Sequence, residues 1–323
     1  MNVYAETQEW PIARPFTISR GTKHTADVVM VTVTDDAYRG RGECVPYARY
    51  GETTEDVVRT IEGFRGPFDR AALADVLPAG AARNALDCAL WDLAAKRGGR
   101  AAWKLAGVPR PVDVVTALTV SLDSPESMGQ RARAARDRAL LKVKLGRDSV
   151  HLDIERLRAV RTHAPRARLV VDVNEGWSLS DLETFVPAAL ETGVEMIEQP
   201  LAEGADAKLA GFRSPVPLCA DESIRDGANL AAIAGCYQAV NIKLDKTGGL
   251  TSALALARQA RARNMAVVVG CMVSTSLSMA PALLLSGFAS FVDLDGPQLL
   301  ARDRDPGLEY NGSRLSFSER VWG

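Results

Sequence analysis

The chain has 323 residues, of which 47% are hydrophobic and 24% charged, and its formal net charge is −1. This composition is typical of a soluble globular protein with one large domain or two ordinary ones, and it predicts neither a nucleic-acid nor a membrane partner. No apolar run approaches the length of a membrane span. The five cysteines are widely spread and form no C-x-x-C pair, which predicts free thiols in a cytoplasmic protein.

The first third of the chain has a mixed pattern. Residues 27–35, rich in β-branched side chains, predict a strand. Residues 53–64 predict a helix with a Thr53 cap, and residues 81–99 predict a long helix that ends at Gly98 and Gly99. The segment 17–27, with the sequence TISRGTKHTAD, is predicted to be a loop.

From residue 112 onward the pattern becomes regular. Short β-rich apolar runs alternate with amphipathic helical runs, and their C-terminal ends are 22 to 28 residues apart. Eight such units in a row predict an α/β fold with a closed (β/α) barrel rather than an open doubly wound sheet. The predicted strands are 114–120, 140–145, 167–173, 194–200, 216–223, 239–245, 266–272 and 288–295.

Carboxylates stand at the ends of the third, fourth and fifth predicted strands: Asp172, Glu198 and Asp221. Any one of them has an ordinary explanation, such as a helix cap at Asp221 or a loop residue at Asp172. Because the carboxyl ends of barrel strands meet at one mouth, three together would repel unless they held a cation. Mg²⁺ suits an all-oxygen set of ligands.

Lysines stand on either side of these carboxylates. Lys142 and Lys144 point to the same side of the second strand, and Lys243 ends the sixth, which lies opposite in a ring of eight. A substrate on the metal would have a lysine on each face, so that Lys144 and Lys243 could invert a stereocentre. The charge of Lys142 would favour a neutral, basic Lys144 and stabilise negative charge on the substrate. Lys246 is interpreted as a loop or supporting charge.

The motifs KVK, VDVNEGW, IEQP, ADES, NIKLDKTGG and GCM, in this order, resemble those of the enolase superfamily, in its muconate-lactonising subgroup. The resemblance implies a modified (β/α)7β barrel over 112–298 and an α+β capping domain over 1–111, to which 299–323 return. It also implies that Asp172, Glu198 and Asp221 bind one Mg²⁺, that Lys144 and Lys243 are the acid–base pair, and that Lys142 assists.

The eighth strand distinguishes reactions within this subgroup. DLDG at 293–296 resembles the Asp-x-Asp motif of dipeptide epimerases, and Asp293 and Asp295 could hold the α-ammonium group of a dipeptide. The resemblance implies epimerisation of the C-terminal residue of an L,L-dipeptide, such as L-Ala-L-Glu, by two-base proton transfer through an enediolate. Lys23 is the candidate to read an acidic side chain, although relatives specific for Ala-Glu commonly carry Arg there, and an exposed loop charge is the alternative interpretation. Thr119 is a further candidate contact. Murein-peptide metabolism is suggested only by analogy.

Other functions remain open. N-succinylamino acid racemase or o-succinylbenzoate synthase activity would use the same metal and lysines, and only the two aspartates argue against it. A Schiff-base aldolase at Lys243 would leave the three carboxylates unexplained. A non-catalytic barrel acting as a binding protein is the alternative from another class. The sequence leaves open whether the chain forms a homo-oligomer.

Overall fold

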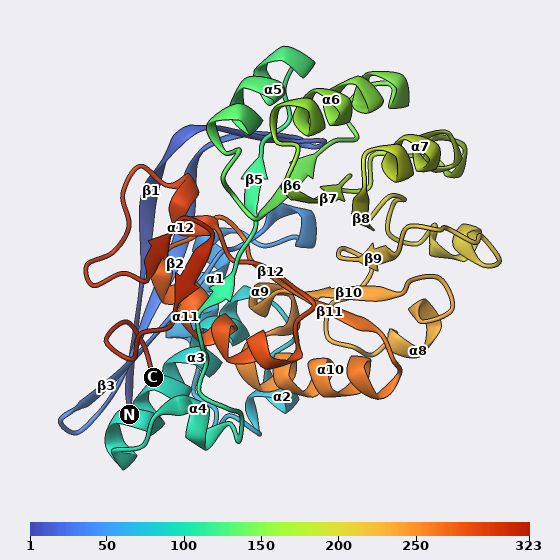
Figure 1. Cartoon of the computed structure of the whole chain (residues 1–323). Coiled ribbons are helices and arrows are strands. Elements are labelled where there is room, and N and C mark those ends of the chain that lie inside the picture. The colour runs from blue at the N-terminus through green and yellow to red at the C-terminus, as the bar shows by residue number, and fades with distance from the viewer.

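Eight parallel strands form the centre of the computed structural model, which describes residues 1–323. They follow one another around a near-barrel in chain order, with helices on the outside (Figure 1). This confirms the predicted fold class. The strands are β5 (Leu118–Val120), β6 (Leu140–Lys144), β7 (Arg168–Asp172), β8 (Val194–Glu198), β9 (Leu218–Ala220), β10 (Ala239–Ile242), β11 (Ala266–Gly270) and β12 (Phe291–Asp293).

The connections between the strands are mostly helical. Two connections contain less helix than the others: the 3₁₀ segment after β8 and the four-residue helix after β9. The outer ring of helices is therefore thinnest at these two places. The outer segments are α5 (Pro125–Ala134), α6 (Val150–His163), α7 (Leu179–Glu191), η2 (Asp206–Leu209), α8 (Leu230–Ile233), α9 (Leu244–Thr247), α10 (Leu250–Ala262), α11 (Ser276–Ala282), η3 (Leu283–Phe288) and α12 (Gly296–Leu299).

The interior of the barrel is apolar toward the N-terminal ends of the strands and polar toward their C-terminal ends. One buried cluster inside it consists of Ala117, Leu140, Val170, Met196, Cys219, Ala239 and Val268. Because side chains on one face of a strand recur every second residue, the next inward positions toward the C-terminal ends are Lys142, Asp172, Glu198, Asp221 and Asn241. The same alternation that fills the core therefore directs the polar residues into the mouth.

The ring closes in a way that the sequence did not predict. The expected strand 114–120 is two strands, because its backbone changes partners in the middle. Its first part, β4 (Val114–Val115), pairs antiparallel with β14, and its second part is β5. Between them, Thr116 forms a bridge to Val292, and Ala117 N donates to Val292 O at 2.8 Å. This short bridge joins β5 to β12.

The N-terminal third forms an antiparallel sheet beside the barrel (Figure 1). Its strands are β1 (Asn2–Ile18), β2 (Gly21–Asp35) and β3 (Tyr38–Cys44), and its helical segments are η1 (Ala48–Tyr50), α1 (Thr54–Glu62), α2 (Leu73–Val76), α3 (Ala81–Gly98) and α4 (Ala102–Leu105). The two long predicted helices are α1 and α3, and the Thr53 side chain accepts from Asp56 N as expected. Sheet and helix approach closely, since a Cβ on Gly42 would lie 2.1 Å from Ala85 O.

The predicted loop 17–27 is wrong in extent. β1 continues to Ile18 and β2 begins at Gly21, so only Ser19 and Arg20 form the turn. The strands stay paired to the tip, with Phe16 opposite Lys23. The physical reason is that a two-residue hairpin with cross-strand pairs leaves no unpaired stretch, even where Gly, Thr and Lys lower the strand signal. Lys23 therefore lies on a strand rather than in a loop.

The C-terminal segment contacts both parts of the molecule. Its strands β13 (Glu309–Asn311) and β14 (Arg314–Ser316) form a small sheet with β4. Further along, Trp322 Nε1 donates to Cys88 O in α3 at 3.1 Å, and the two termini lie on the same side of the molecule (Figure 1). None of the helices combines the length and the hydropathy that a bilayer crossing requires.

Candidate active site

Three carboxylates meet at the mouth of the barrel, each at the end of its own strand. Asp172 ends β7, Glu198 ends β8 and Asp221 follows β9. All three are at most 1% exposed, and one oxygen from each lies within 4.8 Å of the others. The structure thus brings together the three residues that the sequence singled out as metal ligands.

The electrostatics of this triad fit a cation. Burial, together with the charge of Asp172, raises the pKa of Glu198 to about 8. Glu198 Oε2 is buried and accepts no hydrogen bond, although it lies 2.9 Å from Lys142 Nζ. Hard oxygen donors converging in a buried space are the ligand set that Mg²⁺ prefers, so the residues present fit such an ion.

Two lysines flank the triad from opposite sides. Lys144 Nζ lies 2.5 Å from Asp172 Oδ2, and Lys243 Nζ lies 2.6 Å from Asp221 Oδ2. Their strands, β6 and β10, are four positions apart in the ring of eight. Both lysines line the same cavity, of about 290 Å³. A molecule in this cavity therefore has an amino group available on each side.

Lys142 lies deeper than either of them and is 2% exposed. Its Nζ donates to Glu198 Oε1 at 2.9 Å and to Asp293 Oδ2 at 2.8 Å, and lies 3.0 Å from Asp172 Oδ2. Burial alone would lower the pKa of Lys142, but the surrounding carboxylates outweigh it and the pKa is raised well above its usual value. Lys142 is therefore a fixed positive charge, and it shares an oxygen of Asp172 with Lys144.

The two aspartates at the end of β12 lie at the same mouth. Asp293 Oδ1 is buried without a hydrogen-bond partner, while Asp295 Oδ2 accepts from Thr119 N at 2.6 Å. Burial, together with the charge of Asp293, raises the pKa of Asp295 to about 6. Lys142 is thus the one lysine beside the carboxylates of Asp293 and Asp295. This leaves this end of the cavity able to bind a further cation. Thr119 contributes its backbone N–H here.

Lys23 reaches the cavity from the hairpin of β1 and β2. Its ammonium group lies over the ring of Tyr47, 5.1 Å from the ring centroid. Such a cation–π contact restrains a side chain that is otherwise exposed. The cavity thus has a basic group at one end and the aspartate pair among its other walls.

Several polar residues of the site were not predicted from the sequence. Asn241 Nδ2 donates to Glu198 Oε1 at 2.8 Å, and a Cβ on Gly270 would lie 2.4 Å from Asn241 Oδ1, so glycine leaves room for this amide. The position of Asn241 two residues before Lys243 was a usable signal. The others are Asn174, Glu222, Arg20 and Tyr50. Lys246, interpreted from the sequence as a loop or supporting charge, has its buried ammonium group bound to Asp221.

The comparisons with known proteins agree with this fold and site. The N-terminal domain model of the mandelate racemase / muconate lactonizing enzyme family matches residues 1–107, and the enolase C-terminal domain-like model matches residues 127–316. The chain therefore belongs to the enolase superfamily, within the mandelate racemase and muconate lactonizing enzyme family.

Two curated relatives are similar over nearly their whole length. The chain is 45% identical to the L-Ala-D/L-Glu epimerase of Escherichia coli, over 95% of this chain and 97% of the relative. It is 41% identical to the N-acetyl-D-glutamate racemase of a Pseudoalteromonas species, over 92% and 95%.

Two solved structures show what similar proteins bind. An enolase family member from Agrobacterium tumefaciens, with homology to dipeptide epimerases and with sodium and L-Ala-L-Glu bound, is 47% identical, with a TM-score of 0.95 over 99% of both chains. A dipeptide epimerase from Enterococcus faecalis, in complex with Mg and L-Leu-L-Tyr, is 25% identical, with a TM-score of 0.91 over 98% of this chain and 96% of that one.

Proposed function

We propose that this protein is a Mg²⁺-dependent dipeptide epimerase that inverts the α-carbon of the second residue, with L-Ala-L-Glu as the expected substrate. The observation that carries the proposal is the placement of Lys144 and Lys243 on opposite sides of the carboxylate triad, with an aspartate pair at the same mouth. The two relatives described above, one named for L-Ala-D/L-Glu and the other for N-acetyl-D-glutamate, support a glutamate-type substrate.

Asp172, Glu198 and Asp221 would hold the ion, whose charge when bound would make the α-proton of a nearby carboxylate substrate more acidic. In this proposal one lysine takes the α-proton from one face and the other returns a proton to the opposite face, which inverts the configuration. Lys142 supplies a fixed positive charge beside the developing negative charge, because its three carboxylate neighbours keep it ionised.

The aspartate pair would orient the dipeptide by its α-ammonium group. Asp293 Oδ1 supports this role because a buried carboxylate oxygen without a partner is costly unless a donor reaches it. With the ammonium group at this end, Lys23, which lines the same cavity, would pair with an acidic second side chain. Thr119 is proposed to contact the substrate near Asp295.

A second candidate function is racemisation of an N-acylglutamate. The 41% identity to an N-acetyl-D-glutamate racemase favours it, and it would use the same metal and lysines. Such a substrate has no ammonium group, so Asp293 and Asp295 would face an uncharged acyl group instead of a cation. The aspartate pair therefore separates the two candidates.

The test is a comparison of kcat/KM for L-Ala-L-Glu and N-acetyl-L-glutamate with Mg²⁺ present, followed by chiral chromatography. We expect the dipeptide to be preferred by about 100-fold or more, because a site built for an ammonium group rejects a substrate that lacks it. Preference for the acyl compound would favour the second candidate. A protein inactive on both would contradict the proposal.

We further propose the domain division 1–111 with 299–323, and 112–298. Contacts between Ala301 N and Pro11 O at 2.8 Å, and between Ala102 N and Gly323 O at 3.0 Å, support the return of the C-terminal segment to the N-terminal part. A cytoplasmic location is also proposed, supported by five free cysteines, of which three are buried.

A further inference from the structure

The turn after β7 has an unusual backbone. Asn174 and Glu175 have φ angles of 46° and 71°, in the left-handed region that side-chain-bearing residues rarely adopt. Neither is glycine, so the surrounding contacts must hold this conformation. The turn lies two residues beyond Asp172, at the edge of the proposed active site.

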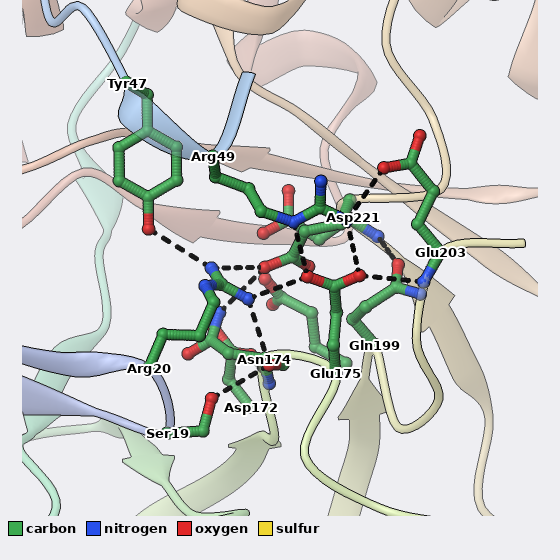
Figure 2. A network of polar contacts seen from close by, with 12 residues as sticks. Ser19, Arg20, Tyr47, Arg49, Asp172, Asn174, Glu175, Gln199, Glu203 and Asp221 are labelled. Carbon is green, nitrogen blue, oxygen red and sulfur yellow. Dashed lines mark hydrogen bonds and ion pairs between the residues drawn. The ribbon is translucent and has the colours of Figure 1, made fainter. Parts of the chain in front are cut away.

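The N-terminal hairpin supplies much of that restraint (Figure 2). At its tip, Ser19 Oγ donates to Asn174 O at 2.8 Å, and Arg20 Nη1 donates to the same oxygen at 3.0 Å. Arg49 forms two parallel hydrogen bonds to the Glu175 carboxylate, each 2.9 Å long. These contacts join residues more than 120 positions apart in the chain, so the turn is restrained from outside the barrel.

The side chain of Asn174 faces the other way, toward the lysine. Its Oδ1 accepts from Lys144 Nζ at 3.2 Å, and its Nδ2 donates to Glu222 Oε1 at 3.2 Å. Because a carboxylate can only accept, the nitrogen of the Asn174 amide must face Glu222. The amide oxygen then faces the ammonium group of Lys144. Arg20 Nη2 also lies 2.8 Å from Glu222 Oε1, so the hairpin restrains Asn174 by two routes.

We propose that Asn174 is a positioning residue for Lys144, and that Arg20 at the hairpin tip holds Asn174 in place. Lys144 has one other contact, Asp172, which belongs to the candidate metal site and also accepts from the backbone N of Asn174 at 3.0 Å. The Asn174 side chain is the contact of Lys144 that lies outside the metal ligands. The hairpin that bears Lys23 thereby also sets the geometry of one of the two bases. Lys243 has no comparable link to the hairpin among its hydrogen bonds, which run to Asp221 alone.

The inference rests on the proposed function, and the test separates the two. Exchange of the α-proton in D₂O with Mg²⁺ is measured by mass spectrometry, starting separately from L-Ala-L-Glu and L-Ala-D-Glu. In a two-base enzyme each lysine exchanges the proton of one epimer. The variant Lys144→Ala identifies the epimer that depends on Lys144, and its loss of exchange with both epimers would contradict the two-base function itself.

The decisive variant is Asn174→Gly, which removes the amide yet accepts a positive φ without strain. We expect the exchange rate of the Lys144-dependent epimer to fall about tenfold more than that of the other epimer, because a base displaced by a fraction of an ångström loses reactivity. Arg20→Gln should show the same asymmetry at about threefold. Arg14→Gln, an exposed arginine on the same hairpin, should match the wild type.

Equal losses for the two epimers in Asn174→Gly, or no loss, would overturn the positioning role while leaving the proposed function intact. A purely structural role for Asn174 predicts equal losses, since a damaged fold affects both faces. Wild-type protein that exchanges neither epimer would overturn the proposed function and this inference with it.

Discussion

Lys246 shows how much one buried residue supports the candidate metal site. Its ammonium group donates to Asp221 Oδ1 at 2.5 Å, to Ile224 O at 3.1 Å and to Asn241 O at 3.0 Å, and its side chain has no exposed surface. From the sequence, Lys246 was predicted only as a loop or supporting charge. In the structure it orients Asp221 and neutralises part of its charge.

We therefore expect Lys246→Met to weaken Mg²⁺ binding by about 10- to 100-fold, as loss of a residue that orients a metal ligand commonly does. Isothermal titration with Mg²⁺ measures this directly, and urea unfolding should show destabilisation of about 3–5 kcal/mol, because a buried pair is broken. Lys208→Met, at an exposed lysine, is the matched control. Unchanged Mg²⁺ affinity in a folded Lys246→Met protein would contradict this role.

Asp293 should matter for the substrate more than for the metal. We expect Asp293→Asn to lower kcat/KM for L-Ala-L-Glu by about 10- to 100-fold, the value of one charged hydrogen bond, while Mg²⁺ affinity stays within about twofold. Steady-state kinetics and Mg²⁺ titration of the same preparation check both parts. An equal loss of Mg²⁺ affinity would assign Asp293 to the metal site instead of the ammonium group.

Residue patterns explain which parts of the site could be predicted. Polar residues at successive strand ends, with period-two alternation for Lys142, Lys144 and the aspartate pair, pointed to these candidates, because each lies on a barrel strand or just after one. Asn174 and Glu222 were not found, because their importance depends on Arg20, roughly 150 to 200 positions away. No glycine marked the left-handed turn at Asn174 and Glu175 either.

At the scale of elements, the hairpin of β1 and β2 is where the structure differs from the prediction made from the sequence. Its tip, residues 17–27, was predicted as a loop, yet the paired strands place Lys23 at a fixed register opposite Phe16. These pairs are local, and the strand signal was weakened by Gly21, Thr22 and Lys23. The split of the predicted strand 114–120 has another origin, because β4 pairs with β14, a backbone partner far along the chain that local propensity does not record.

The hairpin leads to a prediction on specificity. Lys23→Met should lower kcat/KM for L-Ala-L-Glu by about fivefold while changing that for L-Ala-L-Ala by less than about twofold, because a partly exposed ion pair contributes about 1 kcal/mol. Parallel kinetics on the two dipeptides make the comparison. Lys23→Arg, which keeps the charge, should retain the preference. Equal losses on both substrates would show that Lys23 does not read the side chain.

At the scale of the whole molecule, Asp245 joins the barrel to the N-terminal part. It is 4% exposed, and its Oδ1 accepts from Val45 N and Asn84 Nδ2, both at 2.9 Å. Burial raises the pKa of Asp245 to about 7, and the charges of Glu52 and Glu43 add to the effect. The folded protein therefore keeps a proton that the unfolded chain loses near pH 4.

Since the folded state binds more protons between about pH 4 and pH 7, the free energy of unfolding should fall as pH rises through this range, by at most about 1.4 kcal/mol per unit from this group. Asp245→Asn keeps the acceptor oxygen but cannot ionise, so its stability should fall less steeply. Urea unfolding between pH 5 and pH 8 compares the slopes, with exposed Asp137→Asn as control. Parallel curves for wild type and Asp245→Asn would contradict this assignment.

The central claim is that two opposed lysines around a carboxylate-bound Mg²⁺ invert the second residue of a dipeptide. The most direct test is proton NMR of L-Ala-L-Glu in D₂O with the protein and Mg²⁺. The α-proton signal of the glutamate residue should disappear as signals of L-Ala-D-Glu appear, and EDTA should stop both. An α-proton that persists with the protein and Mg²⁺ present, or inversion that continues after EDTA, would contradict the account.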